Sequence, residues 1–445
     1  MALTKIGTDG IKDDAVTSDK VANAINSSIA ANTAKDLTAL SASNLTSGTI
    51  PDARFPTTLP AASAANLTNV PAANITGTLP AISGANLTNL PASGKATNFV
   101  INGAMNAAQR SSSAVTTSDG SNEGYTTVDR WQTIFAGSAG GALSTEQSTD
   151  APDAFEKSVL LKCTTASTSL SGSEHVLFSQ KLEGQDLSSL EWGGSSPKSV
   201  TFSWYMKAVN PKTLAAHLTT PVGSGRYYLK KFTPTTSWAR YSFTIPGDSV
   251  ALPTGTAQSL AIRFGLSIGS GMQQANDSTA WSSTAAHGVS GQGNFLDSTS
   301  NQLFITGVQV ELGDTATDYA HESYADTLAK CQRYLCVALP KGSRATFTEC
   351  ASMYTDQQIQ ASVNFPVTMR TTPSLVYSNV SQYFIAYSAN NNALFSSMNF
   401  ESDVSSNSTG AIYANVGSTS GDWTGNSAMM RDHHNDAYIY FEAEL

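Results

Sequence analysis

Three aromatic residues in polar stretches are the residues of this sequence best suited to binding chemistry. Trp423, Tyr354 and Trp281 each lie among Ser, Thr, Gly and Asp residues. An exposed ring in such a setting can stack on the face of a sugar while neighbouring polar groups bond the sugar hydroxyls. Trp423, between Asp422 and Thr424, is the first candidate, although a tryptophan that anchors its loop is an equal alternative.

Two adjacent histidines near the C-terminal end raise the question of a metal site. His433 and His434 lie between Asp432 and Asp436, and three copies of the chain could bring them together on an axis. Adjacent side chains of a strand point to opposite faces, so one His-His pair chelates poorly. We therefore expect a solvated loop and predict no metal or other cofactor. Both histidines remain candidate receptor contacts.

Nothing in the sequence resembles a known catalytic constellation. There is no G-x-S-x-G, H-E-x-x-H, P-loop or dinucleotide fingerprint. Charged residues make up 13% of the chain, and the formal net charge is −9. This balance argues against nucleic-acid binding. We expect a binding protein and not an enzyme; paired carboxylates that cleave a polysaccharide remain an alternative, because their separation cannot be derived from sequence.

The elements that would position these residues begin with a repeat over 41–95. The stretch Ala65–Asn69 recurs unchanged as Ala85–Asn89, one twenty-residue period later. Prolines at regular intervals exclude a long helix or a central strand. The regularly spaced apolar residues predict a shaft in which three parallel copies of the chain face one another; the alternative is a disordered Ala/Thr/Pro linker.

The region before the repeat, 1–40, contains one predicted helix. Val21, Ile25 and Ile29 recur at helical spacing between about Ser18 and Lys35, which fits a short three-helix bundle of three chains. The N-terminus has no apolar signal region. We therefore expect synthesis in a cytoplasm without a standard export signal.

The region after the repeat predicts two β-rich domains. Strict alternation in 199–208 and in three further runs, separated by Gly/Ser/Asn/Pro clusters, predicts an antiparallel sandwich over 96–320. One linking helix, 321–337, capped by Ser323 and continuing to about Val337, is expected next. Alternation in 359–365 and 439–445 predicts a second, sandwich-like β domain over 338–445. The fold class is therefore mainly β.

Several phrases of the sequence resemble bacteriophage tail fibres. Gly7–Ala22 is similar to the opening of many such fibres, which docks to the virion, and Phe365–Pro373 resembles their distal part. Further phrases resemble, in the same order, a jelly-roll domain of phage fibres: Asn98–Met105, Gln109–Arg110, Tyr125, Asp129–Trp131, Phe178–Gly184, Gly307–Gly313, Ala316–Tyr319 and Cys331–Tyr334. That jelly roll is similar to carbohydrate-binding modules.

The resemblance implies an elongated homotrimeric tail fibre of a virion. Residues 1–40 would attach to a tail or adaptor protein, 41–95 would be the shaft, 96–320 the jelly roll and 338–445 the receptor-binding tip. The expected partners are two further copies of the chain and a bacterial surface glycan or outer-membrane receptor. The alternatives are a tailspike-type depolymerase and a passive spacer fibre.

Overall fold

The computed structural model describes residues 97–342, 346–388, 391–401, 403, 405–417, 423–432 and 434–445, together with Asn23, Ile25, Ser27 and Ser28. Those four residues are helical and exposed and fall within the helix expected in 1–40. The rest of the attachment segment and the shaft 41–95 lie outside the described residues. The chain divides into two units, Met1–Leu87 and Thr88–Leu445.

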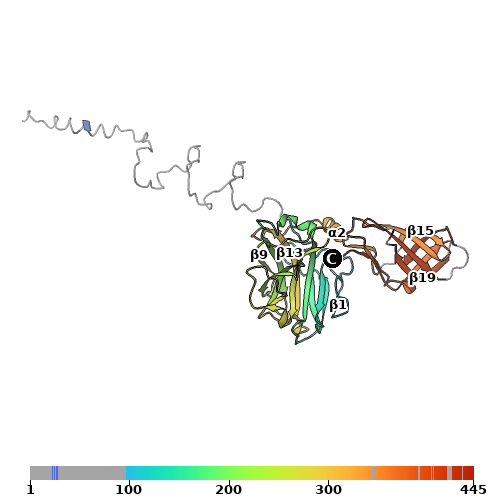
Figure 1. Ribbon diagram of the computed structural model, residues 1–445, viewed down its shortest axis with the longest axis horizontal. Coiled ribbons are helices and arrows are strands. Elements are labelled where there is room, and N and C mark those ends of the chain that lie inside the picture. Colours follow the sequence, from blue (N-terminus) through green and yellow to red (C-terminus); the bar gives the residue numbers. More distant parts are fainter. Residues whose placement is uncertain are drawn as a thin grey trace, which may run out of the picture. The chain divides into compact units, whose positions relative to one another are not determined.

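A sandwich of two antiparallel sheets forms the first part of the second unit (Figure 1). The six-stranded sheet has the order β1 (Val115–Thr117), β3 (Ala142–Ser148), β4 (Ser158–Thr165), β13 (Gln302–Leu312), β6 (Val200–Ala208) and β9 (Ala239–Ile245). The five-stranded sheet has the order β2 (Gln132–Ala136), β5 (His175–Glu183), β10 (Gln258–Ile268), β7 (Leu214–Thr220) and β8 (Arg226–Phe232). Strands distant in sequence are therefore neighbours, as in Greek-key sandwiches.

The prediction that alternate residues of 199–208 face the core is confirmed. In β6, Phe202 and Trp204 turn to the facing sheet, and their rings lie 5.6 and 5.5 Å from the ring of Phe264 in β10, centroid to centroid. Val200 and Met206 share that face and are fully buried. Burial of side chains this large is the main source of stability of such a sandwich.

The linking helix is shorter than expected. Helix α2 spans Tyr324–Gln332, and the side chain of Ser323 caps it by accepting a hydrogen bond from the Asp326 amide at 3.1 Å. The prediction that the helix continues to 337 is wrong, because Leu335–Leu339 is strand β14. Pairing of β14 with β22 (Ile439–Glu442) satisfies its backbone and overrides local helix preference.

The C-terminal domain is a closed barrel and not the sandwich-like arrangement expected, although its β character is confirmed. The barrel order is β15 (Thr346–Thr355), β16 (Gln358–Asn364), β20 (Thr409–Val416), β19 (Asn391–Phe400), β18 (Phe384–Ser388) and β21 (Ser427–Asp432), and β21 pairs with β15 (Figure 1). A three-stranded sheet, β14, β22 and β17 (Ser374–Tyr377), adjoins it, with helix α3 at Val380–Tyr383. Alternating burial fits either form, since both have one inner face.

One loop region covers part of the outer face of the five-stranded sheet. Ala286 and Val289 form a small apolar cluster with Tyr227 and Leu229 of β8. The loop contains β11 (Gln273–Gln274) and β12 (Gly288–Val289), which pair in parallel, and a 3-10 turn at Ser270–Met272. Further 3-10 turns span Gly184–Leu190 and Phe295–Asp297. No helix within the described part of the chain is long and apolar enough to cross a membrane.

Candidate functional site

A groove of about 660 Å³ crosses the outer surface of the barrel over β15, β16 and β20. Its described lining is Ala351, Ser352, Tyr354, Gln360, Ala361, Ser362, Glu401, Ala411 and Ile412. Of these, Ala351, Ala361 and Ile412 belong to the barrel core, and the strand alternation explains the outward position of the polar ones. In β15, Ala351 and Met353 turn into the barrel core while Ser352 and Tyr354 turn outward.

Tyr354 is the most exposed large side chain of the groove. The pairing of β15 with β16 shifts register between Met353 and Thr355, so Tyr354 stands in an irregularity of the ladder. The alternation still holds up to this point, since Met353 is buried and Tyr354 is exposed. The side chain of Tyr354 is 64% exposed, although a phenol ring loses favourable apolar contacts by remaining in water.

The polar groups around Tyr354 are suited to sugar hydroxyls. Ser352 and Ser362 offer hydroxyls that donate and accept, Gln360 offers an amide, and Glu401 offers a carboxyl group. Ser352 and Gln360 are direct cross-strand partners, so they form one polar row beside the ring. Glu401 is the one carboxyl group among the described lining residues, whereas glycoside cleavage requires two in most families.

Trp423, the first candidate from the sequence, is not available for stacking. Its side chain is 3% exposed and lies in the barrel core. Trp423 begins a turn, in which the Asn426 amide donates a hydrogen bond of 3.0 Å to the Trp423 carbonyl. The alternative interpretation, a tryptophan that anchors its loop, agrees with this burial. The expected exposed ring is a wrong prediction, because a loop gives no periodicity that tells an inward residue from an outward one.

Of the two adjacent histidines, the structure describes His434, and His433 lies outside the described residues. His434 is exposed in a turn, where its Nδ1 accepts a hydrogen bond from the Asp436 amide at 3.2 Å and lies 3.4 Å from the Asp436 carboxylate. The described residues contain no group of three or more His, Cys, Asp or Glu side chains placed to hold a metal ion.

Trp281 lies on the sandwich, on a separate surface from Tyr354. Its ring packs edge-on against Trp192 at a centroid distance of 5.1 Å, and its Nε1 donates to the Pro246 carbonyl at 2.8 Å. It borders a polar hollow of about 550 Å³ with Asn276 and Asp277. Because packing against Trp192 and the bond to Pro246 hold the indole, Trp281 offers less free ring surface than Tyr354.

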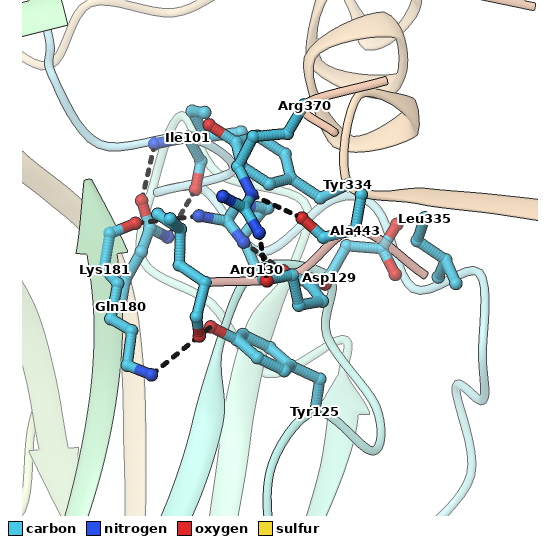
Figure 2. Close-up of polar contacts among 12 residues, drawn as sticks. Ile101, Tyr125, Asp129, Arg130, Gln180, Lys181, Tyr334, Leu335, Arg370 and Ala443 are labelled. Carbon is cyan, nitrogen blue, oxygen red and sulfur yellow. Dashed lines mark hydrogen bonds and ion pairs between the residues drawn. The ribbon is translucent and has the colours of Figure 1, made fainter. Parts of the chain in front are cut away.

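The phrases that resemble phage fibres fold into a hydrogen-bonded network, and Asn98, Phe99 and Ile101 also line a hollow of about 480 Å³ with Arg333 and Tyr334. The side chain of Asn98 donates to the Val308 carbonyl and accepts from the Val310 amide, both at 3.1 Å. Gln180 bonds both backbone groups of Ile101, at 2.8 and 2.7 Å (Figure 2). Because Val308 and Val310 belong to the six-stranded sheet and Gln180 to the five-stranded sheet, the 98–102 segment ties the two sheets together.

The same network holds the last residues of the chain against the sandwich (Figure 2). Arg130 is fully buried, pairs with the Glu444 carboxylate, and has its guanidinium carbon 3.4 Å from the centre of the Tyr334 ring. Burial alone would lower the pKa of Arg130, but Glu444, helped by Tyr125 and Tyr334, more than offsets it, and the pKa is raised. Lys181 Nζ donates to the Leu445 carbonyl at 2.6 Å.

Two further arginines join the sandwich to the C-terminal domain. Arg333 forms two bonds of 2.8 Å to Glu183, whose carboxylate also accepts from the Tyr334 hydroxyl. Burial raises the pKa of Glu183, but the bonds from Arg333 and Tyr334 outweigh it and lower the pKa overall. Arg370 donates to the carbonyls of Ala443 and Thr256 at 2.6 and 3.0 Å. These residues are structural, and sequence resemblance alone did not reveal this role.

Comparisons with known proteins found similar solved structures but no similar sequence. No known protein-family model matches the chain, and no curated protein is similar to it in sequence. One similar solved structure, titled "CBM4 structure and function", is 12% identical with a TM-score of 0.25, and the match covers 47% of this chain and 97% of that one. The CBM22-1 xylan-binding domain of Paenibacillus barcinonensis Xyn10C is 11% identical with a TM-score of 0.23, covering 46% and 99%.

A phage protein is also among the similar structures. The enzymatically active domain of tailspike protein 4 of bacteriophage CBA120 is 12% identical with a TM-score of 0.27. The match covers 48% of this chain and 21% of that one. The similar structures thus include carbohydrate-binding modules and a tailspike domain, and they carry no argument about the ligand of this chain.

Asp129 gives the network a testable pH dependence. Its carboxylate accepts hydrogen bonds from the Gln109 amide and side chain at 2.9 and 2.8 Å, yet burial outweighs them and raises the pKa of Asp129 to about 6. A raised pKa means that the folded protein binds the proton more tightly than the unfolded chain. Protonation therefore adds stability as the pH falls from about 7 towards the ordinary value of 3.8.

We expect Asp129→Asn to remove this gain. Between about pH 7 and pH 4, the free energy of unfolding of wild type should rise relative to that of the variant by on the order of 2 kcal/mol. Urea unfolding at each pH measures this. Asp119→Asn, in an exposed turn, is the control and should leave the pH profile unchanged. An identical pH profile for wild type and Asp129→Asn would contradict the prediction.

Proposed function

We propose that this protein is a non-catalytic receptor-binding fibre of a bacteriophage tail, and that the groove around Tyr354 binds a bacterial surface glycan. The observation that carries the proposal is the 64% exposed ring of Tyr354 in a groove of about 660 Å³ lined by hydroxyl, amide and carboxyl groups. An aromatic face beside hydrogen-bonding groups is the pairing that sugar recognition requires.

The tail-fibre part of the proposal rests on the sequence. The Gly7–Ala22 phrase and the ordered jelly-roll phrases resemble phage fibres, and the proline-punctuated repeat of 41–95 fits a shaft of three chains. In this proposal residues 1–40 attach to the tail, and the protein is part of the virion. Three weak glycan sites in one trimer then bind a cell surface with an avidity above that of any single site.

Replacement of the exposed ring tests the groove. We expect Tyr354→Ala to weaken binding of the full-length protein to host surface polysaccharide about tenfold, as loss of a central aromatic contact does in other interfaces. Surface plasmon resonance on immobilised polysaccharide measures this. Tyr324→Ala is the matched control, because Tyr324 is 56% exposed on helix α2, outside the groove.

Equal binding by wild type and Tyr354→Ala would exclude the groove as the receptor site. Binding lost equally in both variants would show a general surface effect and would also count against the groove. Absence of binding in wild type would favour a passive spacer.

The enzyme alternative has a separate readout. We expect no new reducing ends when the protein is incubated with the polysaccharide that it binds, because the groove has one carboxyl group among its described lining residues. Steady release of reducing ends would instead favour a tailspike-type depolymerase.

Native mass measurement tests the trimer. A particle three times the 46.6 kDa chain mass is expected. A well-folded single copy would overturn the fibre proposal while leaving the glycan-binding groove to be judged by Tyr354→Ala.

A further inference from the structure

Four polar side chains form one register row across the outer face of the five-stranded sheet. Gln132 of β2 pairs with Ser179 of β5, Ser179 with Arg263 of β10, and Arg263 with His217 of β7. The neighbouring inward positions, such as Phe178 and Phe264, fill the sandwich core. Strands lie about 4.8 Å apart, so the row spans roughly 14 Å.

Each member of this row has a buried polar atom without a hydrogen-bond partner. These atoms are Gln132 Nε2, Ser179 Oγ, Arg263 Nε and His217 Nδ1. Ser179 and His217 are 0% exposed and Gln132 is 6% exposed, so more than nine-tenths of each residue is buried. Roughly 90% or more of buried polar groups are normally satisfied, and four unsatisfied atoms in one row therefore require an explanation.

Arg263 differs from other arginines of low exposure, since Arg240 donates to the Thr317 carbonyl and three more pair with carboxylates. Arg130 pairs with Glu444, Arg226 with Asp248 and Arg333 with Glu183. For Arg263, the described residues supply neither a carboxylate nor a hydrogen-bond acceptor. Burial lowers the pKa of Arg263, because a cation that is removed from water without a nearby carboxylate is destabilised.

The groups around Arg263 are the basic side chains of Lys181, His175, His217 and His287 and the phenol of Tyr227. Burial, Arg263 and His175 together lower the pKa of His287 to about 3, and burial followed by Arg263 lowers that of Lys181. The His287 ring lies 4.6 Å from that of His175 and 5.4 Å from that of His217, centroid to centroid. An anion at this place would meet hydrogen-bond donors and the positive charge of Arg263, whereas the histidines, whose pKa values are lowered, add no charge near neutral pH.

Small residues flank Arg263 on its own strand. The outward positions before and after it are Ala261 and Gly265, and His217 is preceded on the same face by Ala215. Arg263 itself keeps partial exposure, so its guanidinium reaches solvent although its Nε does not. A small anionic group can therefore approach the guanidinium from outside.

We propose that the row Gln132–Ser179–Arg263–His217 is a second binding site, which takes an anionic group such as a carboxylate or sulfate. Arg263 would pair with the anion, as guanidinium groups do with planar carboxylates, and the Ser179 hydroxyl and the Gln132 amide would donate to its remaining oxygens. The site is independent of the Tyr354 groove. Its ligand is either a free anion or the acidic substituent of a saccharide.

Ligand-dependent thermal stability tests the proposal on the full chain. A ligand that binds only the folded state raises its melting temperature. Sodium glucuronate, sodium sulfate and glucose are compared with sodium chloride at matched ionic strength. We expect glucuronate, sulfate or both to raise the Tm of wild type, and glucose not to do so. A rise with glucuronate alone assigns the site to a saccharide carboxylate, and a rise with both assigns it to anions in general.

Arg263→Met removes the charge at nearly constant volume, and Arg226→Met is the matched control. The rise in Tm with glucuronate should disappear in Arg263→Met and persist in Arg226→Met, and the rise with sulfate should fall in Arg263→Met to the general stabilisation that excluded sulfate gives. Without ligand, Arg263→Met should melt at or above the wild-type temperature, whereas Arg226→Met should melt several degrees lower because it leaves Asp248 buried and unpaired.

Three results would overturn the inference: no anion-dependent rise in wild type, a rise of equal size with glucose, or the same rise in Arg263→Met. Loss of ligand-free stability in Arg263→Met as large as that in Arg226→Met would also overturn it, since Arg263 would then have a structural partner.

Discussion

Arg130→Met is expected to lower the free energy of unfolding by about 3–5 kcal/mol. Arg130 is fully buried and pairs with Glu444, which is itself 10% exposed. Removing the guanidinium leaves that carboxylate in a poorly solvated place, although Arg110 remains 3.3 Å from it. The contact with the Tyr334 ring is lost as well. Urea unfolding followed by tryptophan fluorescence measures the change.

A double substitution distinguishes the cost of leaving Glu444 unpaired from the cost of losing the other contacts of Arg130. Arg130→Met with Glu444→Met should recover part of the loss, because no charge is then left unpaired at this point. Lys198→Met is the control: Lys198 and Glu191 also pair, but their side chains are 44% and 53% exposed, so a change within about 0.5 kcal/mol is expected. A loss below about 1 kcal/mol in Arg130→Met would contradict the assignment of this pair to the structural network.

Gly103→Ala is expected to cost about 3 kcal/mol for a steric reason. A Cβ at this position would lie 2.1 Å from the carbonyl oxygen of Val308, a backbone atom that cannot move away alone. The Val308 amide also donates to the Gly103 carbonyl at 3.0 Å, so the two segments must stay close. Overpacking of this kind costs 1–3 kcal/mol or more.

Gly172→Ala is the matched control for Gly103→Ala. A Cβ at Gly172 would meet its nearest atom, the Gly271 amide nitrogen, at 3.9 Å, which is ordinary contact. We expect a change within about 0.5 kcal/mol, measured by the same unfolding experiment. Equal stability of the two variants would show that the 98–103 segment can shift without loss and that its close approach to β13 is not required.

The sequence predicted the sandwich well because its strands have two distinct faces. Val200, Phe202 and Trp204 alternate with polar residues, and that alternation fixes which side chains meet the opposite sheet. Closure of the C-terminal barrel was not predictable in this way. It depends on the pairing of β15 with β21, about eighty residues apart, and both a sandwich and a barrel satisfy the same local pattern.

The candidate site was predicted in part. Tyr354 follows the buried Met353 in an alternating strand, so its outward direction is a consequence of local pattern. Trp423 lies in a loop, where residue type gave two equal interpretations and only tertiary packing decides between them. Ser352, Gln360 and Ser362 were missed, although their alternation with Ala351 and Ala361 is a signal that could have identified an outer polar face.

The contacts between the last residues of the chain and the sandwich affect how the two parts can separate. Glu442 and Glu444 form ion pairs with Arg110. Lys181 donates a hydrogen bond to the Leu445 carbonyl, and Arg370 donates one to the Glu444 carbonyl. Separation of the last strand from the sandwich would therefore break several ion pairs as well as backbone hydrogen bonds.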